Sequence, residues 1–225
     1  EDTSEFLKNA GYPSPKEAVS IIRDGNIVNV PHEVEDVKNY FETFGPQVEA
    51  VRGKTVKMHA TNSEIVDLGL KEQRTKQVMF CDVMHVDQQQ FLLSVSTPLE
   101  LTTVSYLPKQ DKNAMGTALQ AQITLLQTRG FQPVRIHVDP QRSLAALQNS
   151  FPGIEMDISG AGDHLDKVDA KIRRVKEMIR SILAGLPYTL PKDKIKDLVV
   201  YAVNRINTRR TSALSDNVSP RVRFT

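Results

Sequence analysis

The sequence predicts an α/β fold in which a mixed five-stranded sheet is flanked by helices, with a small helical N-terminal domain before it. Two observations support this prediction. Three apolar, β-branched segments follow one another with only short polar turns between them, which is typical of adjacent antiparallel strands. Two further apolar segments then alternate with segments of helical periodicity. The chain has 225 residues, enough for one such core and a small second unit.

The predicted strands and helices of the core begin at Gln77, where the sequence becomes richer in β-branched residues. Gly130 marks the end of the first long helix, because glycine readily takes the left-handed conformation found there. The order of the elements matches the ribonuclease-H-like fold. In chain order we expect strands at 77–86, 91–96 and 99–107, a helix at 114–130, a strand at 133–138, a short helix at 143–147, a strand at 154–158, and helices at 166–186 and 192–207.

The first part of the chain has the features of short helices. Ser14, Pro15 and Glu17 form the pattern of a helix N-cap, a first-turn proline and a capping-box acid. A second apolar helical period follows at 32–44 and ends at Gly45. The predicted division of the chain is a helical N-terminal domain at 1–54, a linker at 55–76, the ribonuclease-H-like core at 77–208 and a basic C-terminal extension at 209–225.

The composition excludes several classes of protein. Hydrophobic residues make up 40% and charged residues 25%, which are ordinary values for a globular protein. No apolar run approaches the roughly 20 residues of a membrane-spanning helix, so we expect no membrane partner. The first residue is not a methionine, and we interpret the chain as a fragment of a longer polyprotein.

Cys81 is the only cysteine, which excludes a disulfide framework and a zinc module of the His/Cys kind. Any metal is therefore held mainly by carboxylates, a donor set that favours Mg²⁺ or Mn²⁺. The net charge of +2 is too small to indicate nucleic-acid binding by itself. Lysine and arginine are nevertheless concentrated in 167–180 and 205–223, which points to a polar partner near the C-terminal half.

Three aspartates occupy positions that converge at one end of the sheet in this fold. Asp82 lies inside the first strand, Asp139 closes the fourth strand, and Asp169 lies in the first turns of the helix after the fifth. Clustered carboxylates of this kind bind the two metal ions of phosphoryl transfer. Taken singly, Asp139 is also a common turn residue before proline, and Asp169 also suits a helix N-terminus. Four other aspartates compete for the role from turns, strand edges and helix caps: Asp87, Asp157, Asp163 and Asp166.

The helix that carries Asp169 also carries a line of cations. Arg173, Lys176 and Arg180 follow at +4, +7 and +11, next to the apolar stripe of the helix. Such a line can contact DNA phosphates without reading the bases. The alternative is an ordinary solvated basic face.

Several segments of the chain, taken together, have the pattern of one known family. These segments are Phe80–Val86 with Phe91–Val95, Asp163–Glu177, Leu186–Tyr188, Asn204–Asn207, Ala10–Ser14 and Val51–Lys54. They resemble the integrase core of retrotransposons, and in particular that of the Copia-like elements of algae and other protists. The resemblance covers most of the chain and is most specific around Asp169.

The resemblance implies an integrase-type polynucleotidyl transferase, in which Asp82, Asp139 and Asp169 are catalytic metal ligands for Mg²⁺ or Mn²⁺. It places Arg173 and Lys176 at the terminal DNA of the element. It also implies DNA 3′-end processing and strand transfer, with the DNA of the element and the target DNA as partners. The resemblance further implies assembly into a homo-oligomer. The protein would be part of a cytoplasmic particle first and would act in the nucleus.

The sequence departs from the family pattern at three points. The third acid of the family is usually glutamate, and here it is Asp169. The next residue is usually basic, and here it is Ala170. Only 29 residues lie between Asp139 and Asp169, fewer than in the commonest pattern of the family. Two alternatives therefore stay open beside the integrase. One is a degenerate or domesticated core that binds nucleic acid or assembles without cutting. The other is a ribonuclease H or resolvase nuclease on the same fold.

Overall fold

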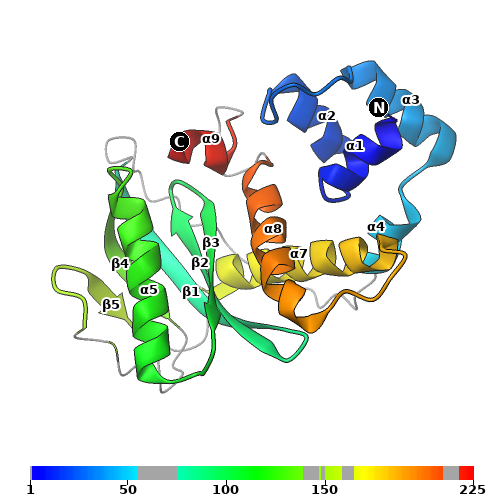
Figure 1. Ribbon diagram of the computed structural model, residues 1–225. Helices are drawn as coiled ribbons and strands as arrows, with labels where there is room; N and C mark the ends of the chain where they lie inside the picture. Colours follow the sequence, from blue (N-terminus) through cyan, green and yellow to red (C-terminus); the bar gives the residue numbers. More distant parts are fainter. Residues whose placement is uncertain (1, 55–74, 139–146, 148–149, 159–164, 210–217) are drawn as a thin grey trace. The chain divides into compact units, whose positions relative to one another are not determined.

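The computed structural model describes residues 2–54, 75–138, 147, 150–158, 165–209 and 218–225 (Figure 1). Contacts within the chain divide it into two compact units. The sheet unit comprises residues 58–173 and 224, and the helical unit comprises residues 1–57, 174–223 and 225.

Among the described residues of the sheet unit, five strands form a single mixed sheet in the order β3-β2-β1-β4-β5. β1 is antiparallel to β2, and β2 to β3, whereas β4 is parallel to β1 and β5 is parallel to β4. This order and these directions confirm the predicted ribonuclease-H-like fold. The strands are β1 at Lys76–Val86, β2 at Gln89–Thr97, β3 at Leu101–Leu107, β4 at Gln132–Val138 and β5 at Glu155–Asp157.

A two-residue turn at Asp87 and Gln88 sets the register of the first hairpin. Both residues have positive φ angles, 45° and 63°, as the tight hairpin turn that matches the twist of the strands requires. β2 consequently begins at Gln89, two residues earlier than the sequence predicted. The hairpin register pairs Asp82 with Leu93 on β2.

Helix α5, Lys112–Gln127, covers one face of the sheet (Figure 1). Met79 and Cys81 of β1 lie in the core on this face, together with Leu119 of α5. Because side chains alternate between the faces of a strand, Phe80 and Asp82 lie on the opposite face. The acid predicted on β1 therefore faces away from the apolar core beneath α5.

The helical unit contains the predicted N-terminal helices and the last long helix. The predicted capping box is confirmed at Ser14 and Glu17, where each side chain accepts a hydrogen bond from the other residue's backbone N–H. The helices are α1 at Thr3–Asn9, α2 at Pro15–Arg23, α3 at Val34–Phe44, α4 at Val48–Lys54, a 3₁₀ helix at Lys192–Lys194 and α8 at Ile195–Asn207.

Two helices contribute residues to both units: α7 at Leu165–Gly185 and α9 at Pro220–Phe224. The sequence did not predict α4 or α9. The second half of α7 and all of α8 group with residues 1–57, whereas the sequence assigned these helices to the core. No helix among the described residues is long and apolar enough to cross a membrane.

One ion-pair network links α2 to α7 and to the end of α8 within the helical unit. Glu17 of α2 contacts Arg174 of α7 at 2.7 Å and Arg209, which follows α8, at 3.3 Å.

The domain boundaries stay predictions. Residues 55–74 of the proposed linker lie outside the described residues. Of the proposed short helix at 143–147, only Leu147 is described, and it is buried.

Candidate carboxylate site on the sheet

Asp82 lies on β1, the central strand of the sheet, and its side chain is half-buried. Its neighbours in sequence, Cys81 and Val83, are buried in the apolar core. The Val83 N–H donates a hydrogen bond of 2.6 Å to Asp82 Oδ1, which orients the carboxylate. Carboxylates are seldom placed within central strands for packing alone, so this position favours a function.

The second predicted acid, Asp139, lies outside the described residues. The strand that leads to it is well defined. Val138 ends β4 and is paired in parallel register with Cys81 of β1. Asp82 and Asp139 are therefore the residues that follow two register partners on adjacent strands.

The third predicted acid, Asp169, is exposed on the part of α7 that belongs to the sheet unit. A buried ion pair fixes this part of the helix to the sheet. Lys171 Nζ lies 3.8 Å from Glu100 Oε2 in the turn between β2 and β3, and about nine-tenths of each side chain is buried. Since Lys171 is two residues from Asp169, the pair positions the helical turn that carries the third acid.

The described residues contain no group of three or more histidine, cysteine, aspartate or glutamate side chains placed to hold a metal ion. Only Asp82 and Asp169 of the predicted triad are among them, so the metal site as a set stays a prediction. The donor chemistry of these acids fits the predicted ion, because Mg²⁺ and Mn²⁺ prefer carboxylate oxygens.

The predicted line of cations on α7 contains two exposed residues and one that is half-buried. Arg173 is exposed and Lys176 is half-buried. Arg180 is exposed, and its Nε donates a hydrogen bond of 3.0 Å to the Gly53 carbonyl. Arg180 therefore has a structural contact within the helical unit, and the DNA contacts of all three residues stay predictions.

Sequence reasoning missed a polar and aromatic stack beside Asp82. His137 of β4 is buried, and its ring stacks on Phe80 of β1 with 5.0 Å between ring centroids and 11° between planes. His137 Nδ1 lies 3.2 Å from Asp157 Oδ2 of β5, in an electrostatic contact rather than a well-aligned hydrogen bond. Lys167 Nζ, at the start of α7, lies 5.6 Å from the centroid of the Phe80 ring.

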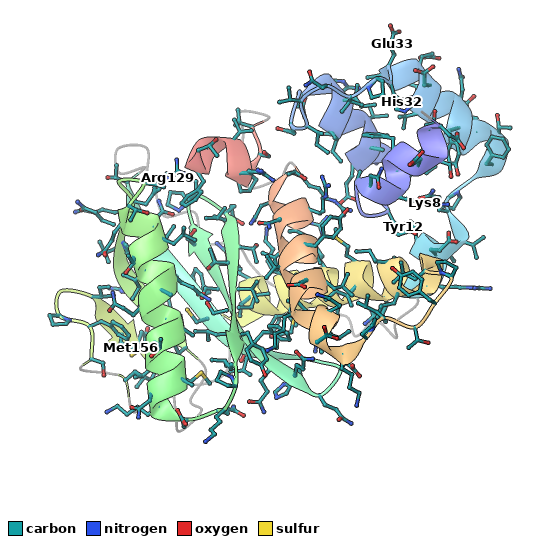
Figure 2. The ribbon with its side chains drawn as sticks, viewed as in Figure 1. Lys8, Tyr12, His32, Glu33, Arg129 and Met156 are labelled. Atoms are coloured by element: carbon teal, nitrogen blue, oxygen red, sulfur yellow. The ribbon has the colours of Figure 1, made fainter. Side chains whose placement is uncertain are left out.

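Met156, which is labelled in Figure 2, belongs to the face of the sheet beneath α5, and this stack lies on the opposite face. It is the middle residue of β5 and packs in the core beneath α5. Its neighbour Asp157 therefore lies on the opposite face. His137 is the register partner of Asp157, and Phe80 is the register partner of His137, so both rings lie on that face too. Asp82 is on this face as well. A histidine inside an apolar strand, two residues before Asp139, was the sequence signal that could have revealed the stack.

Cys81, adjacent to Asp82, has no part in this chemistry. The thiol is buried in the core beneath α5. Burial, assisted by the nearby Asp82 charge, raises its pKa to about 12 against the opposing effect of a hydrogen bond to Ser94. The thiol is therefore almost entirely protonated at neutral pH, and its burial in the core beneath α5 argues against a role as a nucleophile.

Comparisons with known proteins give similarity to solved structures only. No protein-family model matches the chain, and no curated protein matches it in sequence. The catalytic core domain of BIV integrase is 14% identical with a TM-score of 0.49, and the match covers 65% of this chain and 92% of that chain. The HTLV-2 integrase catalytic core domain in complex with magnesium, in a trimeric form, is 17% identical with a TM-score of 0.48, covering 65% and 94%. The fold assignment rests on the strand order and register of the sheet.

Proposed function

We propose that this chain is the catalytic region of a retroelement integrase, a polynucleotidyl transferase that processes DNA 3′ ends and joins them to target DNA. The observation that carries the proposal is the position of Asp82. It places a half-buried carboxylate on the central strand of a ribonuclease-H-like sheet. The residue before it is paired with the residue that leads into Asp139.

In the proposed site, Asp82, Asp139 and Asp169 hold Mg²⁺ or Mn²⁺ through carboxylate oxygens. The bound ions supply activation of the attacking oxygen and stabilisation of the leaving oxygen in an in-line displacement. The protein's own contribution is orientation. The Val83 N–H holds the Asp82 carboxylate, and the Lys171–Glu100 pair holds the turn of α7 that carries Asp169.

The proposed reaction has two displacements at phosphorus. In end processing, a water oxygen forms a bond to phosphorus, the bond to the 3′ oxygen breaks, and that oxygen leaves as the new 3′-hydroxyl. In strand transfer, this 3′-hydroxyl attacks a target phosphodiester and displaces another 3′ oxygen. Neither step forms a covalent bond to the enzyme.

The proposal includes DNA as the partner, contacted at its phosphates by Arg173, Lys176 and Arg180. Arg173 is the best placed of these, because it is exposed one helical turn after Asp169. Assembly of several copies, action in the nucleus after a cytoplasmic particle, and descent from a Copia-like element are further parts of the proposal. These three parts rest on the sequence resemblance alone.

A strand-transfer assay tests the proposal. Short duplexes are incubated with a labelled plasmid and the full chain, in Mg²⁺ and separately in Mn²⁺, and joined products are quantified. We expect metal-dependent joining by the wild-type chain and its loss in Asp82→Asn. The matched control is Asp87→Asn, which changes an exposed acid at the end of the same strand in a turn that asparagine tolerates.

The same assay separates the rival functions. Equal joining by the wild type and Asp82→Asn would refute the catalytic reading and leave a nucleic-acid-binding or assembly domain. Increased joining by Asp169→Glu would identify the shorter third acid as an impairment. Cleavage of RNA–DNA hybrids or four-way junctions without joining would instead identify a nuclease on this fold.

A further inference from the structure

The stack beside Asp82 is built from four separate elements. The Asp157 carboxylate of β5 contacts the His137 imidazole of β4, which stacks on the Phe80 ring of β1. The ammonium of Lys167, at the start of α7, lies over the Phe80 ring, 5.6 Å from the ring centroid. Phe80 and His137 are both buried, so the aromatic part has a fixed position.

The stack ends in an exposed positive charge close to Asp82. Lys167 is exposed, and none of the ion pairs formed between described side chains includes it. Phe80 and Asp82 lie on the same face of β1, and in a strand their Cα atoms are about 7 Å apart. The Phe80 ring therefore seats the Lys167 ammonium beside the strand position that carries the first acid.

We infer that Lys167 is a phosphate-contacting residue of the carboxylate site, positioned by the ring of Phe80. This inference rests on the proposed function, since it assigns a DNA contact to the same site. It differs from the predicted basic line on α7, because Lys167 precedes Asp169 and is seated on the sheet. The partner it fits is the phosphate next to the bond that reacts.

The physical argument concerns the freedom of the lysine side chain. A lysine in water samples many rotamers, and fixing it at a phosphate costs entropy. An ammonium that rests over an aromatic face is attracted by the negative face of the ring and is already confined. Because the ring is itself held by His137, the charge stays near Asp82 before DNA binds.

The salt dependence of DNA binding tests this inference directly. The affinity of the full chain for a duplex is measured by fluorescence anisotropy across salt concentrations, for the wild type, Lys167→Met and Lys167→Arg. Loss of one phosphate contact lowers the slope of log affinity against log salt by about 0.9. We expect this loss in Lys167→Met and near wild-type behaviour in Lys167→Arg. The matched control is Lys112→Met, which removes an exposed lysine at the start of α5.

A double-mutant cycle tests the role of the ring. Phe80→Leu keeps an apolar side chain but removes the aromatic face, and its folding is checked by thermal unfolding. If Lys167 acts through this ring, Phe80→Leu lowers the slope, and adding Lys167→Met lowers it by less than it does in the wild type. Additive effects would overturn the positioning by Phe80. Joining at saturating DNA should fall in Lys167→Met by roughly 10- to 100-fold, as for other losses of substrate positioning.

The outcomes distinguish the inference from the proposed function. If Lys167→Met binds DNA with the same slope as Lys112→Met, the inference is refuted, whether or not the chain joins DNA. If the slope falls as expected but the wild type joins no DNA, Lys167 is a phosphate contact and the transferase function is refuted. If the wild-type chain does not bind DNA at all, both are refuted.

Discussion

Replacement of Glu17 by glutamine should destabilise the helical unit far more than an ordinary surface change. The carboxylate of Glu17 contacts Arg174 at 2.7 Å and Arg209 at 3.3 Å. It also accepts the Ser14 N–H at 2.9 Å in the capping box of α2. Only 18% of the Glu17 side chain is exposed, so the ion pairs are weakly screened by solvent.

The size of the effect follows from what the substitution leaves behind. Arg209 is 8% exposed and also donates a hydrogen bond of 2.8 Å to the Gly11 carbonyl. Without the Glu17 charge, its guanidinium becomes a buried cation without a counter-charge at this contact. Breaking a buried ion pair in this way costs about 3–5 kcal/mol. Glutamine can still accept the Ser14 N–H, so we expect a loss of about 3 kcal/mol in the free energy of unfolding.

The pH dependence gives an independent check. Burial raises the pKa of the Glu17 carboxyl, but Arg209, the Ser14 N–H and Arg174 together outweigh it and hold the pKa below the ordinary value of 4.5. A group with a lowered folded-state pKa stabilises the protein above its unfolded-state value, and this stability is lost as the pH falls through the folded-state pKa. The wild type should therefore lose stability below about pH 4.5, and Glu17→Gln should lose less over the same range.

Urea unfolding followed by circular dichroism measures both effects. At pH 7 the Glu17→Gln midpoint should move by an amount equivalent to about 3 kcal/mol, whereas Glu42→Gln, an exposed acid on α3, should change by less than about 0.5 kcal/mol. Equal stabilities of these two variants would refute the reasoning. A pH profile of Glu17→Gln parallel to that of the wild type would do the same.

Three further substitutions or probes test other parts of the structure. Gly53→Ala should destabilise the chain by about 1–3 kcal/mol in the same urea assay, because the new Cβ would lie 2.7 Å from the Ser181 backbone nitrogen. This steric cost is larger than the gain from the higher helix propensity of alanine. A stabilised variant would contradict this packing. Lys171→Met should lower the free energy of unfolding by about 3 kcal/mol, because it leaves Glu100 charged and buried. The double variant Lys171→Met/Glu100→Gln should lose less stability, and equal losses in the two variants would contradict the ion pair. Cys81 should react with a maleimide at pH 8 only on unfolding, since burial raises its pKa to about 12, and rapid labelling of the folded chain would contradict its burial.

The sheet was predictable because its signals are local. The β-branched runs, the polar turn after Val86 and the helical period from residue 114 each arise from neighbouring residues. The short helix α4 was missed because its seven residues follow Gly45 and Pro46 and are too few to display a period. α9 was missed because it has only five residues and lies in the C-terminal extension, where the basic charge was the only predicted feature.

The grouping of the helices was not predictable, because it depends on pairs that are distant in sequence. Glu17 was identified only as a capping acid, yet its partners Arg174 and Arg209 lie more than 150 residues away. The candidate site divides in the same way. Asp82 was identifiable as a charge within an apolar strand, whereas the contact of Lys167 with Phe80 requires knowledge of which helix crosses which face.

The central claim is that Asp82, Asp139 and Asp169 hold divalent metal together, and Mn²⁺ binding followed by electron paramagnetic resonance tests it most directly. The full chain is titrated with Mn²⁺, and free ion is quantified for the wild type, for each of the three Asp→Asn variants and for the Asp87→Asn control. We predict that each of the three site variants binds Mn²⁺ more weakly than the wild type, while Asp87→Asn retains wild-type binding. Indistinguishable binding curves for all five proteins would contradict the claim.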